Sequence, residues 1–299
     1  MKQLDAVIDD IKKTFSSFTP ETPLAAIRSA VDKLFVHQTD VECARERVSL
    51  GDAEAELITA KGVTKEDGAI LYIHGGGFVV CSIDSHRGLA ERLSQEANAA
   101  VLLVGYRLAP EHPFPAALDD SVAGYQWLLA KGYDSSQLAI AGDSAGGGLV
   151  LTTLHALKQR GLPLPACAAV LSPWVDLELT GESMVSRAEL DPLVTTDGLK
   201  AWAGCYAPGM DLNNPLLQPL KGDLKGMPPL LIQIGEREAL YDDSKSLADA
   251  ARAAGVEVEW QYFPGQIHDF QMFGHRLDEA RTALKDLGTF IRKRLDAAR

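Results

Sequence analysis

A serine at a glycine-rich turn is the residue best placed to do chemistry in this chain. The segment from Gly142 to Gly147 reads Gly-Asp-Ser-Ala-Gly-Gly and holds a G-x-S-x-G pattern around Ser144. The apolar run 138–141 predicts a buried strand before it, and the apolar spacing over 149–157 predicts a helix after it. Such a turn holds the serine in a cramped conformation and presents its hydroxyl at the start of a helix, where N–H groups face developing negative charge. The pattern predicts a nucleophile; the simpler interpretation is a loop whose serine caps the helix.

A serine hydroxyl needs a general base before it can attack a carbonyl carbon. Among the seven histidines, His268 lies in a loop that directly follows the last predicted strand. If the strands are parallel, that loop leaves the sheet at the same edge as the turn of Ser144. His275 lies at the start of a helix, and the other histidines lie in helical, glycine-rich or proline-rich segments. We therefore predict that His268 is the base.

A third group must orient the base, and the loop after the predicted strand 230–234 offers several carboxylates. Glu238 lies in the middle of that loop and is the preferred candidate. Glu236 follows the strand so closely that its side chain is expected to point away. Asp242 and Asp243 precede a helical pattern, where helix capping and the helix dipole account for them. Glu238 is the predicted acid, and Asp242 is the alternative.

A second glycine-rich loop, His74-Gly75-Gly76-Gly77, follows the predicted buried strand 69–73. Successive glycines let backbone N–H groups approach the oxyanion of a tetrahedral intermediate without interference from side chains. A phosphate-binding loop is the competing interpretation, but neither the GK[ST] nor the GxGxxG spacing is present. The loop therefore predicts oxyanion donors at Gly75, Gly76 and Gly77.

The elements that must position these residues alternate along the chain. Residues 43–50 and 53–60 predict a hairpin, and from residue 69 onward strands alternate with helices up to a final helix over 277–295. This order predicts an α/β fold with a mostly parallel sheet of about eight strands and helices on both faces. Two amphipathic helices, interrupted at Pro20 and Pro23, precede the sheet, and the segment 177–226 has no convincing strand.

Composition narrows the classes of protein that the chain could belong to. It has 299 residues, and its formal net charge of −12 gives no basic surface for nucleic acid and disfavours an anionic membrane. The charged N-terminus does not resemble a signal peptide, and no apolar run is long enough to span a bilayer. Four scattered cysteines show no metal-binding spacing. We expect a cytoplasmic protein that has no stable membrane insertion.

Three motifs together resemble the hormone-sensitive lipase family of α/β-hydrolase esterases. They are His74-Gly-Gly-Gly-Phe78, Tyr106-Arg-Leu-Ala-Pro-Glu-His-Pro-Phe-Pro-Ala116 and Gly142-Asp-Ser-Ala-Gly-Gly147. The resemblance extends from about residue 65 to the C-terminus and implies the α/β-hydrolase fold with a helical cap. It implies that Gly76, Gly77 and the N–H of Ala145 form the oxyanion hole, and that His74 braces that loop. It also implies a carboxylesterase without cofactor or metal that often dimerises through the last strand.

Two positions depart from the family pattern. The acid loop usually reads Asp-Pro-Leu-x-Asp, whereas here it reads Glu238-Ala-Leu-Tyr-Asp242. Asp191-Pro192-Leu193 imitates that motif but precedes the strand of the acid loop, so we assign it to the cap. After the base, Asp269 stands where glycine is more common.

The sequence therefore predicts a serine carboxylesterase that acts on short- to medium-chain acyl esters of small molecules through Ser144, His268 and Glu238. The alternatives are an amidase or deacetylase with the same triad, and a non-catalytic ligand receptor such as the gibberellin receptors, which resemble this family but lack a working base. The predicted domains are cap helices over 1–42, a catalytic domain over 43–176 and 227–299, and a cap insertion over 177–226.

Overall fold

A central sheet of eight strands organises the chain in the computed structural model, which describes residues 2–19 and 21–298. The strand order is β1-β2-β4-β3-β5-β6-β7-β8; β1 and β2 run antiparallel to their neighbours, and the other pairs are parallel. The predicted break at Pro20 and the predicted domain ends at residues 1 and 299 lie outside the described residues. The strands are β1 (Cys43–Leu50), β2 (Ala53–Ala60), β3 (Ala69–Ile73), β4 (Ala100–Gly105), β5 (Leu138–Asp143), β6 (Cys167–Leu171), β7 (Leu230–Gly235) and β8 (Val258–Phe263).

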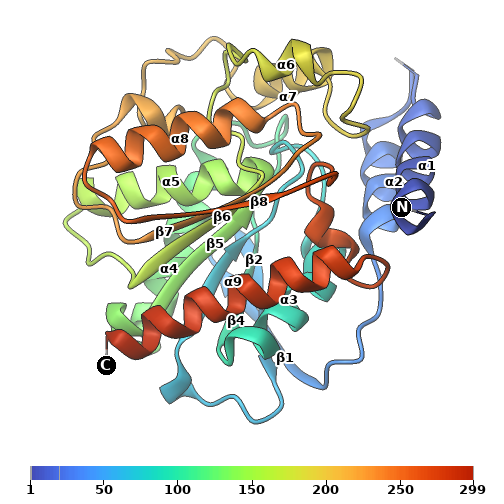
Figure 1. Ribbon diagram of the computed structural model, residues 1–299. Coiled ribbons are helices and arrows are strands. Elements are labelled where there is room, and N and C mark those ends of the chain that lie inside the picture. Colours follow the sequence, from blue (N-terminus) through green and yellow to red (C-terminus); the bar gives the residue numbers. More distant parts are fainter. Residues whose placement is uncertain (1, 20, 299) are drawn as a thin grey trace.

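Helices cover both faces of this sheet, which confirms the predicted α/β architecture. Helices α3 and α9 pack together on one face, while α4, α5 and α8 cover the other (Figure 1). Strands β3, β5, β6 and β7 are buried along their whole length, as expected for near-continuous apolar runs in a parallel sheet. The helices are α1 (Lys2–Ser16), α2 (Leu24–Phe35), α3 (Ile83–Ala97), α4 (Ala116–Ala130), α5 (Ser144–Gln159), α6 (Ser183–Ser186), α7 (Thr196–Tyr206), α8 (Tyr241–Ala253) and α9 (Asp278–Ala297).

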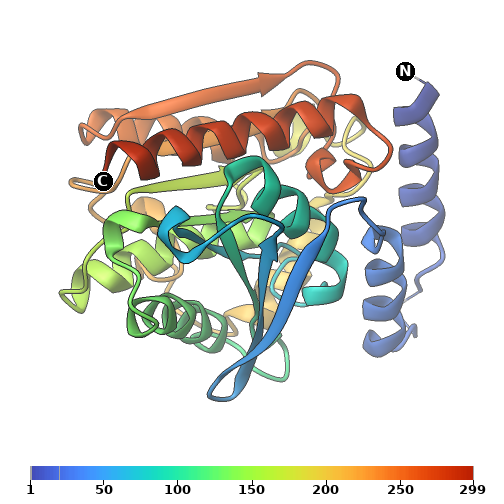
Figure 2. The same ribbon diagram turned by 90° about the horizontal axis from the view of Figure 1, so that it is seen from below.

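Two segments lie outside the layered core. Helices α1 and α2 stand side by side at one end of the sheet in both views, and their apolar stripes are buried (Figures 1 and 2). The segment 177–226 contains the short helices α6 and α7 and no strand. The division of the chain into cap and catalytic domains stays a prediction.

The last strand forms one edge of the sheet. Among the described strands, β8 pairs only with β7, so its other side carries unpaired backbone groups. Dimerisation through this edge stays a prediction.

Candidate active site

The turn between β5 and α5 forces Ser144 into the conformation that its sequence pattern predicts. The φ angle of Ser144 is +48°, in the left-handed region that few non-glycine residues adopt. Gly146 must lack a side chain, because a Cβ there would collide with the carbonyl oxygens of Ile73 and His74. Ser144 is only 6% exposed but lines an internal cavity. The local packing thus holds its hydroxyl toward that cavity.

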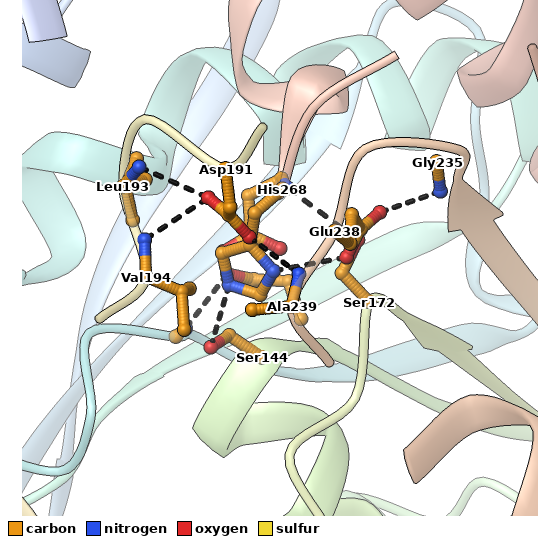
Figure 3. A network of polar contacts seen from close by, with 12 residues as sticks. Ser144, Ser172, Asp191, Leu193, Val194, Gly235, Glu238, Ala239 and His268 are labelled. Carbon is orange, nitrogen blue, oxygen red and sulfur yellow. Dashed lines mark hydrogen bonds and ion pairs between the residues drawn. The ribbon is translucent and has the colours of Figure 1, made fainter. Parts of the chain in front are cut away.

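The structure brings Ser144, His268 and Glu238 into one chain of contacts (Figure 3). Ser144 Oγ lies 3.0 Å from His268 Nε2, and His268 Nδ1 lies 3.0 Å from Glu238 Oε2. Because the carboxylate is an acceptor, Nδ1 carries a proton, and in the neutral imidazole Nε2 can then accept the serine proton. All three side chains are buried. This arrangement can generate a serine nucleophile.

Other groups hold the carboxylate of Glu238 in place. Its Oε1 accepts hydrogen bonds from Ser172 Oγ at 2.8 Å and from the N–H of Gly235 at 2.5 Å. Burial raises the pKa of Glu238 to about 7, although the hydrogen bond from His268 lowers it. Ser172 was not found by sequence reasoning, because nothing in its own segment marks it as a partner of the acid.

The other carboxylates of the acid loop are bound elsewhere. Asp242 accepts the N–H of Ser183, and Asp243 accepts the N–H groups of Val175 and Asp176. The expectation that these two aspartates cap α8 is wrong, because their oxygens bind other segments and α8 has no side-chain cap. Glu236 is exposed and accepts the N–H of Gly265 at 2.7 Å, away from His268. Geometry therefore favours Glu238 over Asp242 as the partner of the base.

The three glycines of the loop after β3 differ in their contacts. Gly76 and Gly77 have positive φ angles and line the cavity, and their N–H groups make no hydrogen bond with the described residues. The N–H of Gly75 instead donates to Asp143 Oδ2 at 3.0 Å. The prediction that Gly75 is an oxyanion donor is therefore wrong, since its N–H already has an acceptor. Ala145 lies in the first turn of α5, where N–H groups have no partner within the helix.

A buried network of hydrogen bonds around Asp143 holds the glycine loop in place. Asp143 also accepts hydrogen bonds from Tyr72 Oη at 2.9 Å and His86 Nε2 at 3.1 Å. Burial raises the pKa of Asp143, but the charge and hydrogen bond of His86 outweigh this effect, so the pKa lies below its usual value. A carboxylate held in this way anchors the loop through Gly75.

His74 packs beneath the same loop. Its ring stacks on Tyr106 with 4.2 Å between centroids, and its Nδ1 donates to Gly75 O at 2.8 Å. Burial lowers the pKa of His74 to about 3. A neutral, stacked histidine braces the loop and is not available as a base.

The cavity in front of Ser144 has a volume of about 280 Å³. His268, Gly76 and Gly77 line it near the serine. Most of its remaining wall is apolar and comes from α1, α2, the 177–226 segment and the turn after His268. These side chains are Phe15, Val31, Phe35, Leu193, Val194, Leu199, Trp202 and Met272.

Asp191 connects the 177–226 segment to the acid loop (Figure 3). Its Oδ2 accepts the N–H of Ala239 at 2.8 Å, and its Oδ1 accepts the N–H groups of Leu193 and Val194 at 3.0 Å each. Asp191 is not the acid, in line with its assignment to the cap. Its link to the residue after Glu238 was missed, because the two lie far apart in sequence.

Residues 2–19 and 21–298 were also compared with the requirements of a metal site and of a membrane-spanning helix. These residues include no group of three histidine, cysteine or acidic side chains that could hold a metal ion. No helix within the described part of the chain is long and apolar enough to cross a bilayer.

Comparison with known proteins agrees with the fold. Residues 70–272 match a family model described as alpha/beta hydrolase fold. The chain is 42% identical over 246 residues to an acetyl-hydrolase of Streptomyces hygroscopicus, covering 82% of this chain and 81% of that protein. It is 37% identical to the esterase LipU of Mycobacterium tuberculosis, covering 93% and 96%. The crystal structure of an esterase from the bacterial hormone-sensitive lipase family has a TM-score of 0.94 and 40% identity, covering 99% of both chains.

The fold and the site thus define an α/β hydrolase. Within that class, the chain belongs to the hormone-sensitive lipase family. It is a carboxylic ester hydrolase.

Proposed function

We propose that this enzyme hydrolyses short- to medium-chain acyl esters through a triad of Ser144, His268 and Glu238 and an acyl-enzyme intermediate. The observation that carries the proposal is the chain of contacts from Ser144 through His268 to Glu238, which opens into a cavity beside free N–H groups. In this reading, Gly76, Gly77 and Ala145 donate to the oxyanion.

The first half of the reaction acylates the serine. Ser144 Oγ bonds to the ester carbonyl carbon while its proton passes to His268 Nε2, and the carbonyl electron pair moves onto the oxygen in the oxyanion hole. The tetrahedral intermediate collapses, the bond to the alcohol oxygen breaks, and His268 returns the proton to that oxygen. Glu238 stabilises the imidazolium that forms between these steps.

The second half releases the acid. Water gives a proton to His268 Nε2 and attacks the acyl carbon, and a second tetrahedral intermediate forms on the same donors. When the bond to Ser144 Oγ breaks, His268 returns the proton to the serine. The products are a carboxylic acid and the free enzyme.

The size of the cavity supports the limit on chain length. Its volume of about 280 Å³ lies just below the range typical for small-molecule pockets. Trp202 covers Gly77 so closely that a Cβ on that glycine would collide with the indole ring. A short acyl chain fits such a space with its apolar atoms against the apolar wall.

The test is hydrolysis of p-nitrophenyl esters from acetate to palmitate by the full chain, beside Ser144→Ala. We expect turnover that is highest for short chains and is lost in the variant. Equal activity in Ser144→Ala would overturn the triad, and a maximum at palmitate would overturn the chain-length limit. If only anilides of the same acids are cleaved in a Ser144-dependent manner, an amidase is supported instead.

A further inference from the structure

A second carboxylate lies against the catalytic histidine, on the side opposite Glu238. Asp269 Oδ2 is 3.1 Å from His268 Nε2, the same nitrogen that lies 3.0 Å from Ser144 Oγ. In a neutral imidazole with its proton on Nδ1, Nε2 carries a lone pair, which a carboxylate oxygen does not attract. In an imidazolium, Nε2 carries a proton that this oxygen can accept. The contact is favourable only when His268 is charged.

The backbone of Asp269 has an uncommon conformation. Its φ angle is +51°, in the left-handed region that few non-glycine residues adopt. The residue is only 6% exposed, and its Oδ1 has no hydrogen-bond partner among the described residues. Its N–H makes a long contact of 3.4 Å to Ser172 Oγ. Within residues 2–19 and 21–298, His268 is the one group that lies within hydrogen-bond distance of this carboxylate.

The titratable surroundings of Asp269 are mostly acidic or neutral. The groups that face it or His268 come from five other elements or loops: Tyr72, Cys81, His86, Asp143 and Glu238. Burial raises the pKa of Asp269 to about 6, although His268 lowers it. Asp269 is therefore ionised in neutral and alkaline solution.

We propose that Asp269 is a positioning residue that acts as a second counter-ion for His268 and holds the imidazolium formed in each half of the reaction. This proposal rests on the proposed function of the triad. When the proton of Ser144 moves to Nε2, the new N–H is shared between the leaving oxygen and Asp269 Oδ2. The proton then goes to the leaving alcohol, and Asp269 itself is neither protonated nor consumed.

The same contact sets the pH at which the free enzyme becomes active. Burial lowers the pKa of His268, but Asp269 and Glu238 outweigh it, so the pKa lies well above its usual value. The base must be neutral before it can accept the serine proton. The activity of the enzyme should therefore rise at a higher pH than it would without the two carboxylates, and removal of the Asp269 charge should lower that pH.

The test is the pH profile of kcat/KM for Asp269→Asn, with p-nitrophenyl acetate as substrate. Asparagine has nearly the same shape and tolerates the left-handed conformation, but it carries no charge. We expect the acidic limb to move to lower pH by about one to two units, and the alkaline plateau to fall several-fold because the imidazolium has lost a counter-ion. A uniform loss of activity with no movement of the limb would show a structural role only and would overturn the proposal.

Two further variants control for poor folding of the asparagine variant and for the general effect of removing a buried carboxylate. Asp269→Gly removes the charge and relieves the backbone, so it should show the same movement of the limb even if the asparagine variant folds poorly. Asp243→Asn is the matched control, since it removes another buried aspartate that contacts Val175 and Asp176 but not His268. Its acidic limb should stay where it is in the wild type.

An NMR titration of ¹⁵N-labelled histidine separates this proposal from the proposed function. The ring signals of His268, identified by their absence in His268→Gln, should titrate at lower pH in Asp269→Asn than in the wild type. Absence of ester hydrolysis by the wild type would refute the proposed function, and the titration would still test the counter-ion. An unchanged midpoint in Asp269→Asn would refute the counter-ion whatever the activity.

Discussion

The described residues include two buried arrays of serine, histidine and carboxylate that both reach the cavity, but only the first has its serine there. Ser144, His268 and Glu238 form the first. In the second, Ser85 Oγ lies 2.9 Å from His86 Nδ1, and His86 Nε2 lies 3.1 Å from Asp143 Oδ2. The contact distances of the two arrays are nearly the same. Residue types and distances alone therefore do not make a catalytic site.

The surroundings of the two serines differ. Ser85 is fully buried in the first turn of α3, where its Oγ accepts the N–H of Ser82 and donates to Ser82 O. Its hydroxyl is used to cap a helix and does not line the cavity. Ser144 lies at a strained turn, lines the cavity and has free N–H groups nearby. The serine at the cavity and the free N–H groups beside it therefore distinguish the array of Ser144, which we propose to be catalytic, from the array of Ser85.

Removing each serine should give the largest contrast between the arrays. Ser144→Ala should lower kcat by a factor on the order of 10⁶, because the nucleophile is lost. Ser85→Ala should leave kcat within a few-fold of the wild type and lower the free energy of unfolding by about 1 kcal/mol through the lost cap. Ester hydrolysis and urea denaturation measure the two effects. A large loss of kcat in a folded Ser85→Ala enzyme would contradict the distinction.

Neutralising the acid of the catalytic array should have the next largest effect. Glu238→Gln should lower kcat by about 10⁴-fold, because the amide no longer holds the proton of His268 on Nδ1. Asp242→Asn is the matched control and should stay close to wild-type activity, since Asp242 binds Ser183 and not the base. Single-turnover kinetics of acylation compare the two variants. Near-normal acylation in Glu238→Gln would remove Glu238 from the triad.

Neutralising the carboxylate of the structural array should have a smaller effect on catalysis. Asp143→Asn weakens the anchor of Gly75 and so displaces the oxyanion donors, which should lower kcat by about 10- to 100-fold. Because Asp143 also binds Tyr72 and His86, the free energy of unfolding should fall by about 1–3 kcal/mol. Kinetics and thermal unfolding on the same preparation test both parts. An unchanged kcat in a destabilised protein would show that the hydrogen bond from Gly75 to Asp143 is not needed to position the oxyanion donors.

Asp191 should have the smallest effect on turnover. Asp191→Ala leaves three N–H groups without their acceptor, which should lower the free energy of unfolding by about 1–3 kcal/mol. We expect kcat to fall less than tenfold, since Glu238 keeps its own hydrogen bonds. Glu189→Ala, an exposed neighbour, is the control and should change neither quantity. A loss of kcat as large as that of Glu238→Gln would show that the acid depends on the 177–226 segment.

Sequence reasoning predicted the sheet and the order of its elements, and it singled out the three residues Ser144, His268 and Glu238 that the structure brings into contact. It could do so because strands and turns are local patterns, and because parallel strands bring their loops to one edge. It failed where a polar group forms a hydrogen bond with a residue that is distant in sequence. The N–H of Gly75 looked free until Asp143 was seen to accept it, and Ser172 and Asp191 show their contacts with the acid loop only after the chain has packed.

The left-handed backbone of Ser144 also bears on the evolutionary history of the chain. Glycine adopts this conformation freely, whereas serine does so at a cost of about 1–3 kcal/mol. With Ser144 as the nucleophile, as we propose, selection for hydrolysis would hold the protein below the stability that its fold could reach. A descendant released from that selection would gain stability by replacing this serine with glycine, so the loss of catalysis in such a lineage would be favoured by folding and not merely tolerated.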